Sequence, residues 1–133
     1  MHRTLTALLL LTGLVTAAAL AAGAAKSVPL RSQPLDGIPN KVADMATVEY
    51  APGGSTPAHR HNAHVLVYVL EGALEMGVNG KEPVTVSAGQ TFYESPTDVH
   101  TISRNASKTA GAKFLVVLIH DQGSSTMAPV TQK

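Results

Sequence analysis

Short apolar runs separated by turn residues fill the chain from Ala43 to Ile119. The runs are rich in β-branched and aromatic residues, and none of them repeats with the period of a helix, so they are typical of strands. We predict seven strands, at residues 45–51, 65–70, 73–78, 84–86, 91–93, 99–103 and 114–119. The pattern therefore predicts an all-β protein.

Turn formers lie between these runs, and the Asn79-Gly80 pair is the strongest of them. Both central residues of a type I′ turn need positive φ, which asparagine and glycine tolerate. We therefore expect residues 73–78 and 82–86 to form a hairpin. Short strands spaced about ten residues apart favour one antiparallel barrel or sandwich, because closure removes exposed sheet edges.

The segments on either side of the strand-rich region 43–120 have a different composition. Residues 26–42 carry three prolines, which forbid a helix and discourage a central strand. We expect an extended Pro-rich arm that either crosses the domain surface or reaches a neighbouring subunit. Residues 121–133 are polar, and we expect them to form a poorly ordered tail.

Residues 1–25 resemble a secretory signal peptide. Arg3 precedes an uncharged stretch in which a Leu-rich part is followed by a tract of small residues, which is the order of such a signal. Cleavage between Ala22 and Ala25 predicts a periplasmic or secreted protein with no membrane contact afterwards. An uncleaved anchor is the alternative, since about 20 apolar residues can span a bilayer, but the Ala-rich second half favours cleavage.

The composition of the 133-residue chain narrows its function. The formal net charge is only +1, the basic residues are scattered, and there is no Trp, so neither a basic patch nor an aromatic platform for nucleic acid is indicated. The chain has no cysteine and therefore no disulfide. A small domain in an oxidising compartment then needs a closed core, a bound metal or an oligomer interface for its stability.

Three histidines have the spacing of a metal site. His59 and His61 are separated by one residue, so on an extended strand both side chains point the same way. His100 comes from a distant strand and could complete a trio. Three imidazoles that converge in a dry interior are costly unless they bind something, which favours a divalent metal over an exposed, metal-free histidine pair.

The first histidine motif resembles that of the cupin superfamily, whose members are small jelly-roll barrels. In family form it runs glycine, five residues, His-x-His, three or four residues, glutamate, six residues, glycine. Gly53, His59, His61 and Gly72 fall on this spacing. The family's glutamate would lie at Val65, and a valine cannot bind a metal.

The second family motif runs glycine, five residues, Pro-x-Gly, two residues, histidine, three residues, asparagine. The separation of Gly89 from His100 matches it. Pro96 is displaced by one residue, Asp98 replaces the second glycine, and Asn105 comes one residue late. A local shift of the turn would explain these departures.

The resemblance covers residues 43–120 and implies a single small antiparallel jelly-roll β-barrel behind the N-terminal signal peptide. It also implies that His59, His61 and His100 point into the barrel as ligands of one metal ion. Iron, manganese, nickel, copper and zinc all suit such a site, and the sequence does not choose among them. A homodimer is the family's usual state, and the Pro-rich arm could exchange between its subunits.

Three alternatives remain for the fourth position on the metal. His64 could reach it only if the strand begins with a bulge, because adjacent residues on a strand face opposite ways. Glu94 has the parity of an inward residue, although it could instead be a surface carboxylate paired with Arg104. Water could also fill the position.

Two further residues are weighed for roles outside the trio. Arg104 shares parity with His100 and could project inward to bind a substrate carboxylate, though arginine is mostly found at the surface. His120 ends the last apolar strand, where solvent exposure is expected, and we do not count it as a ligand.

The resemblance implies two functions from different classes. One is a metal-dependent oxidoreductase, with dioxygenase-type oxidation of a small oxygen-rich molecule as the commonest family precedent. The other is a non-catalytic module that binds a metal or a small ligand, which the short stretch from Gly72 to Gly89 favours because it leaves no room for an active-site lid. A metal-free structural barrel is the third alternative.

Overall fold

In a computed structural model of the chain, residues 23 and 25–130 are described. This part of the chain forms eleven strands and no helix. The strands are β1 (Lys26–Pro34), β2 (Lys41–Tyr50), β3 (Ser55–Thr56), β4 (His59–Arg60), β5 (His64–Glu71), β6 (Ala73–Val78), β7 (Val84–Ser87), β8 (Thr91–Glu94), β9 (His100–Asn105), β10 (Ala112–Asp121) and β11 (Ala128–Pro129). No membrane-spanning helix is present among the described residues.

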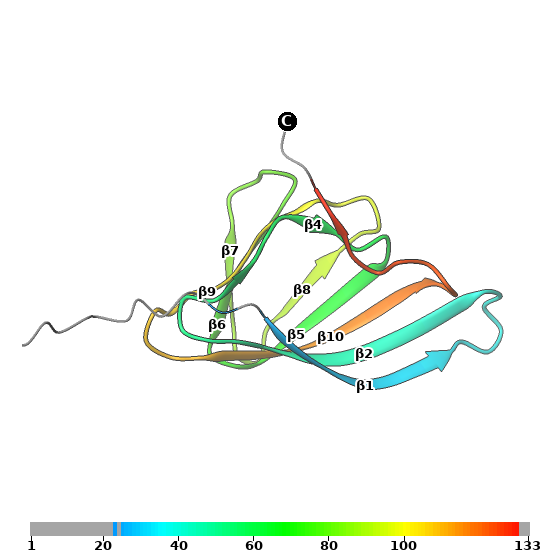
Figure 1. The fold of residues 1–133 in the computed structure, drawn as a ribbon, viewed down its shortest axis with the longest axis horizontal. Helices are drawn as coiled ribbons and strands as arrows, with labels where there is room; N and C mark the ends of the chain where they lie inside the picture. The colour runs from blue at the N-terminus through cyan, green and yellow to red at the C-terminus, as the bar shows by residue number, and fades with distance from the viewer. Residues whose placement is uncertain (1–22, 24, 131–133) are drawn as a thin grey trace, which may run out of the picture.

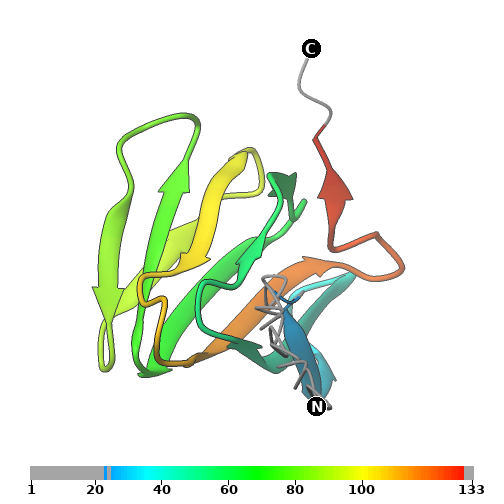
Figure 2. The same cartoon turned by 60° about the vertical axis from the view of Figure 1, so that its left-hand side comes forward.

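The strands form two antiparallel sheets that lie on opposite sides of one interior (Figures 1 and 2). The first sheet has the order β1-β2-β10-β5-β8. The second has the order β11-β4-β9-β6-β7, with β3 beside β9. The expected all-β jelly-roll barrel is therefore confirmed.

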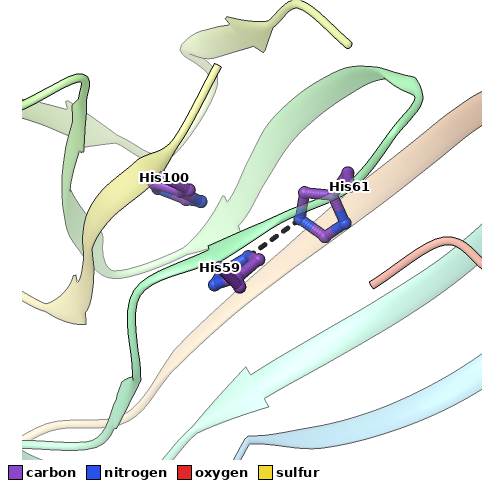
Figure 3. Close-up of side chains that lie close together, drawn as sticks. All are labelled: His59, His61 and His100. Atoms are coloured by element: carbon purple, nitrogen blue, oxygen red, sulfur yellow. Dashed lines mark hydrogen bonds between the residues drawn. The ribbon is translucent and has the colours of Figure 1, made fainter. Parts of the chain in front are cut away.

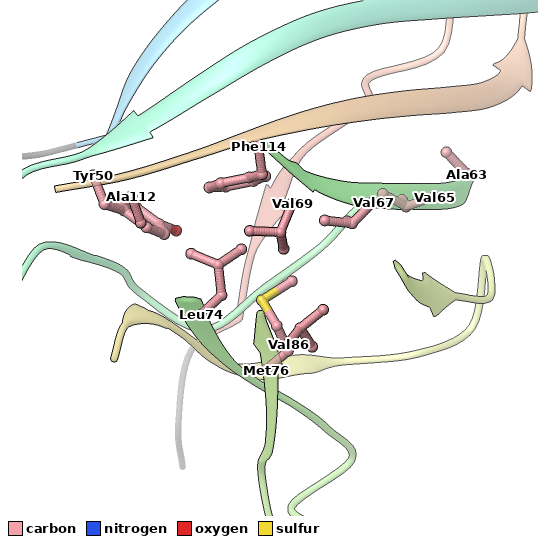
Figure 4. Packing of buried hydrophobic residues seen from close by; sticks show 10 residues of the cluster. All are labelled: Tyr50, Ala63, Val65, Val67, Val69, Leu74, Met76, Val86, Ala112 and Phe114. Atoms are coloured by element: carbon pink, nitrogen blue, oxygen red, sulfur yellow. The ribbon is translucent and has the colours of Figure 1, made fainter. Parts of the chain in front are cut away.

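Side chains from both sheets meet in the core, as Figure 4 shows. Val67 and Val69 of β5 and Phe114 of β10 project from the first sheet toward Leu74 and Met76 of β6. All five are at most 4% exposed, so the barrel is closed by packed apolar side chains at this end. Burial of this kind is the main stabilising term available to a domain without disulfides.

The alternation of β5 decides which of its residues face the interior. Val65 and Val67 are 1% and 2% exposed, whereas Leu66 and Tyr68 are 47% and 44% exposed. Successive side chains of a strand point to opposite faces, so odd-numbered residues of β5 line the barrel and even-numbered residues lie outside it. Position 65 therefore faces the interior and position 64 faces outward.

The predicted hairpin is present between β6 and β7. The strands pair from Ala73 opposite Ser87 to Met76 opposite Val84. At the turn, Asn79 and Gly80 have φ angles of 55° and 70°, as a type I′ turn requires.

The Pro-rich arm forms part of the first sheet. Residues 26–34 make the edge strand β1, which pairs with β2 of the same chain, and its register shifts between Pro29 and Arg31. Proline is tolerated there because an edge strand leaves one side of its backbone unpaired. The arm therefore crosses the surface of its own domain in this structure.

The tail differs from the sequence-based expectation. Residues 128–129 form β11, which pairs with β4, and the Val130 amide donates to the Ala58 carbonyl at 3.3 Å. The prediction of a poorly ordered tail is thus wrong for residues 121–130, because backbone pairing holds a segment that has few apolar side chains. The expected signal peptide at residues 1–25 lies outside the described residues, apart from Gly23 and Ala25.

Candidate metal centre

The second sheet brings His59 and His100 together with His61 at one end of the barrel interior (Figure 3). One ring nitrogen from each histidine lies within 4.8 Å of the others. His59 of β4 is the direct register partner of His100 on β9, and His61 follows β4 by one residue. His59 and His100 are buried and His61 is half-buried. The trio is therefore able to hold a metal ion, as the spacing predicted.

Backbone carbonyls fix the tautomers of two of these rings. His59 Nδ1 lies 2.7 Å from the Pro57 carbonyl oxygen, and His61 Nδ1 lies 2.8 Å from the Thr126 carbonyl oxygen. A carbonyl can only accept a hydrogen bond, so both Nδ1 atoms carry the proton and donate it. The Nε2 atom of each neutral ring is then a bare lone pair aimed into the site, which is how metal-binding histidines are held.

These two Nε2 atoms face one another at 2.9 Å, the contact drawn as a dashed line in Figure 3. With both rings neutral, two acceptors meet at that distance, and the contact is repulsive unless a cation lies between them. Two nitrogens bound about 2.05 Å from one metal ion at a right angle would be about 2.9 Å apart. The donor pair therefore fits a metal ion, and a single shared proton is the other cation that would satisfy it.

His100 has the same need for a partner. Both of its ring nitrogens are buried and make no hydrogen bond within the described residues. Burial, with the nearby His59 and His61, lowers the pKa of His100 to about 3, so the ring is neutral near pH 7. Buried polar atoms without partners are rare because each costs about 1–3 kcal/mol, and a metal bond would satisfy one of these nitrogens.

Glu94 ends β8 with its carboxylate beside the trio. The side chain is 3% exposed, with Oε1 3.2 Å from His100 Nδ1 and Oε2 4.0 Å from His61 Nε2. Burial, reinforced by the negative charge of Asp98, raises the pKa of Glu94 to about 7. A carboxylate held in such surroundings is stabilised by a bound cation, and carboxylate oxygen is a usual partner of histidine around divalent metals.

His64 is not brought to the site. It lies exposed on the outer face of β5, where its Nδ1 is hydrogen-bonded to the Tyr93 hydroxyl at 2.7 Å. The pairing of His64 with Ile119 and of Val65 with Leu118 is regular, so no bulge turns His64 inward. Of the two side chains weighed for the fourth position, the structure places Glu94, and not His64, beside the histidines.

Arg104 points away from the cavity. Its even spacing from His100 had predicted that it would project inward, so that prediction is wrong. The pairing of β9 with β6 shifts register between His100 and Ile102, which inserts one extra residue and inverts the alternation beyond it. Ser103 therefore faces inward, and Arg104 forms an exposed ion pair with Glu75. A role for Arg104 inside the barrel, and an ion pair with Glu94, are both excluded by this arrangement.

His120 is buried rather than exposed. Its Nε2 lies 2.7 Å from Asp44 Oδ2 and its Nδ1 lies 2.9 Å from the Asp121 carbonyl oxygen. Both partners accept, so the ring donates from both nitrogens as an imidazolium. Burial acts to lower the pKa of His120, but the bonds to Asp44 and Asp121 outweigh it and raise that pKa overall. This pair could not be predicted from the sequence because 76 positions separate its members.

The C-terminal segment supports the site through its backbone. Thr126 supplies the carbonyl that orients His61, and β11 pairs Pro129 with His59 and Ala128 with Arg60. Residues 122–130 thus run directly alongside the His59–His61 motif. No sequence pattern could show this, since the contacts are made by main-chain atoms that every residue type carries.

The histidines and Glu94 open into a cavity of about 970 Å³. Its walls come from β1, β2 and the inner faces of β5 and β10, with the C-terminal segment beside them. The apolar lining includes Val65, Val67, Met76, Phe114, Val116 and Leu118. A small molecule could therefore reach the histidines from a largely hydrophobic chamber.

Residues 46–118, more than half of the chain, match the model of the cupin domain. The chain belongs to the cupin family. Among known proteins, this cupin is 40% identical over 65 residues to germin-like protein 1-1 of Oryza sativa subsp. japonica, covering 45% of this chain and 30% of that protein. It is 36% identical over 78 residues to the rhicadhesin receptor of Pisum sativum, covering 55% of this chain and 36% of the receptor. The cupin thus spans about a third of the length of these relatives.

Solved structures with similar folds include an oxalate oxidase and a double-stranded β-helix protein. An oxalate oxidase in complex with the substrate analogue glycolate superposes with a TM-score of 0.57 and 29% identity, over 66% of this chain and 46% of that chain. A protein from Klebsiella pneumoniae with a double-stranded β-helix domain superposes with a TM-score of 0.65 over 84% of both chains. At 17% identity, the second likeness shows the shared fold alone.

Proposed function

We propose that this cupin binds one divalent metal ion through His59, His61 and His100, with the Glu94 carboxylate as the fourth protein ligand. The observation that carries the proposal is the 2.9 Å contact between the Nε2 atoms of His59 and His61, whose Nδ1 protons are committed to carbonyl oxygens. Iron, manganese, nickel, copper and zinc all accept nitrogen and oxygen donors of this kind. Water is the alternative for the fourth position.

The activity we propose is oxidation of a small molecule of the dioxygenase type. A bound metal would supply Lewis acidity or oxygen activation, depending on its identity. Within the chain, the histidines and Glu94 would hold the ion, and the apolar cavity would receive the molecule and exclude water from it. In the metal-free chain burial raises the pKa of Glu94 to about 7, and a cation bound by its carboxylate would lower that pKa again. The likeness to an oxalate oxidase supports an oxidoreductase.

The second candidate is a non-catalytic cupin that binds a metal or a small ligand. It is favoured by the segment from Gly72 to Gly89, which β6, β7 and their turn fill almost completely. This segment adds no lid over the cavity, and lids are a common means of sequestering a reaction. Both candidates share the metal site and differ in whether the bound molecule is transformed.

We further propose that the protein acts outside the cytoplasm after removal of residues 1–25, in the periplasm or secreted. The Ala-rich order of that segment supports this location. A homodimer is the proposed assembly. Size-exclusion chromatography with light scattering of the processed protein tests it, and a monomer at micromolar concentration would contradict it.

Metal content, measured by plasma mass spectrometry on tag-free protein, tests the metal site. We expect close to one ion per chain in the wild type and little in His100→Ala. His64→Ala is the matched control, because it removes an exposed histidine outside the trio and should keep the ion. Wild-type protein that takes up none of the five metals on titration would contradict the proposal.

Oxygen consumption by the metal-loaded protein then separates the two functions. Consumption that needs a bound small molecule and is lost in His100→Ala would support the oxidoreductase. A loaded protein that binds small molecules without transforming them would support the binding module.

A further inference from the structure

The cavity offers little to a doubly charged ligand. Arg31 is the one lysine or arginine that lines it among the described residues, and it lies exposed on the edge strand β1, hydrogen-bonded to Gln33. Two carboxylates, Glu94 and Asp44, line the cavity as well. A dicarboxylate with one end at the histidines would therefore leave its other end without a buried cation, which is costly.

Three neutral polar groups of the cavity are already paired with one another. The Tyr50 hydroxyl lies 2.5 Å from Thr56 Oγ1 and 2.8 Å from Ser103 Oγ. Asp44 Oδ2 is likewise bound to His120, whereas Asp44 Oδ1 is buried and has no hydrogen-bond partner within the described residues. A ligand would have to compete with these contacts for Tyr50 or Asp44 Oδ2, so the polar atoms open to it lie at the three histidines and Glu94 and at Asp44 Oδ1, which as a carboxylate oxygen accepts and so does not attract an anion.

The remaining wall is apolar and larger than a small acid needs. Val116 and Leu118 of β10 are only half-buried and present their side chains to the cavity beside Val65 and Val67. A volume of about 970 Å³ lies at the upper end of the roughly 300–1,000 Å³ of pockets that hold drug-sized ligands. Glycolate or oxalate would touch only a small part of this wall.

We propose that the ligand of this cupin is an amphipathic molecule, with one oxygen-bearing head at the histidines and a hydrocarbon body along the apolar wall of β5 and β10, and that small dicarboxylates are poor ligands. The proposal rests on the proposed metal site and adds the chemical class of its ligand. Apolar contact with Val65, Val67, Val116 and Leu118 should stabilise the bound amphipathic molecule. A dianion would gain no comparable stabilisation, because no buried cation lies near its second charge.

A series of α-hydroxy acids with a constant head tests this directly. Metal content is measured first, and calorimetry then follows the binding of glycolate, 2-hydroxybutanoate, 2-hydroxyhexanoate, 2-hydroxyoctanoate and oxalate to the loaded protein. Each buried methylene group should raise the affinity up to about fourfold. We expect 2-hydroxyoctanoate to bind far more tightly than glycolate and oxalate.

Matched variants place the hydrocarbon body in the cavity. Val116→Thr puts a hydroxyl on the inner wall at nearly constant shape and should weaken the dependence on chain length while glycolate binding stays unchanged. Val117→Thr makes the same change on the outer face, opposite Leu66, and should leave the series unaltered.

The outcomes separate the two proposals. Affinity that is flat along the series in loaded protein, or tightest for oxalate, would overturn the amphipathic ligand and leave the metal site standing. An equal loss for all acids in Val116→Thr would overturn the placement of the hydrocarbon body. Protein that takes up no metal at all would remove the proposed function and this inference with it.

Discussion

Val65 of β5 and Glu94 of β8 are direct partners across two antiparallel strands, and both side chains are buried in the interior. Directly opposed residues have Cβ atoms about 4.5–5.5 Å apart. The resemblance to other cupins puts a glutamate at position 65, so this chain supplies a carboxylate from the neighbouring strand to nearly the same place. We propose that this carboxylate compensates across the sheet for the departure from the motif.

Exchanging the two side chains tests this compensation. Glu94→Val should lower metal affinity at least tenfold because it removes a ligand, and the double change Val65→Glu/Glu94→Val should restore much of the loss. Metal titration followed by calorimetry measures both. Glu82→Gln, which changes an exposed carboxylate, is the control. A Glu94→Val protein with wild-type affinity would show that water fills the fourth position.

The His120–Asp44 pair should make stability depend on pH. The raised pKa of His120 means that the folded protein holds a proton which the unfolded chain releases above about pH 6.5. The contribution is therefore complete below pH 6.5 and is lost as the pH rises through the folded-state pKa. Asp44 is half-exposed, so we expect about 1 kcal/mol.

Urea unfolding of wild-type protein and His120→Gln at pH 6 and pH 9 measures this effect. The wild type should lose more stability than His120→Gln over that interval. His64→Gln, at an exposed histidine, should behave as the wild type does. Equal losses in wild type and His120→Gln would refute the assignment of an imidazolium at position 120.

The C-terminal segment should be needed for metal affinity. A chain that ends at Asp121 loses the Thr126 carbonyl and β11, so His61 is free to rotate, and we expect affinity to fall about 10- to 100-fold. A chain that ends at Val130 keeps both contacts and serves as the control. Adding His61→Ala to the shorter chain should cost little more, since the two changes remove one interaction. Strictly additive losses would argue against positioning of His61 by this segment.

Two glycines with positive φ should respond differently to alanine. Gly72 has φ +74°, and a Cβ there would lie 2.8 Å from the Gly111 carbonyl oxygen, whereas Gly80 has φ +70° and open space around it. Gly80→Ala should cost about 1–2 kcal/mol of unfolding free energy from backbone strain alone. Gly72→Ala adds a clash with rigid backbone and should cost clearly more. Denaturant unfolding compares the stability of the two variants. Similar losses would mean that the backbone at Gly111 moves away from residue 72 easily.

The sequence predicted those features that depend on local pattern. Runs of β-branched and aromatic residues located β5 and β6, the Asn79-Gly80 turn predicted the hairpin of β6 with β7, and the one-residue spacing of His59 and His61 indicated a shared direction. The features that the sequence did not predict depend on strand register and on hydrogen bonds of the main chain. The extra residue after His100 inverted the expected side of Arg104, and β11 was missed because its pairing uses backbone atoms of a polar segment.

The fourth position of the proposed metal site also could not be predicted from the sequence of one strand. The sequence left Glu94, His64 and water open for that position, and the register of β5 against β10 and β8 places Glu94 inside the barrel and His64 outside it. Register is a property of two strands together, so one strand's sequence does not contain it.

The central claim is that His59, His61, His100 and Glu94 bind one ion. Anomalous diffraction at the zinc edge, from crystals of the tag-free protein grown with Zn²⁺, tests it most directly. We predict one strong peak at about 2.0–2.2 Å from a nitrogen of each of the three histidines and from an oxygen of Glu94. No peak among these residues, or zinc bound only at surface histidines such as His64, would contradict the claim.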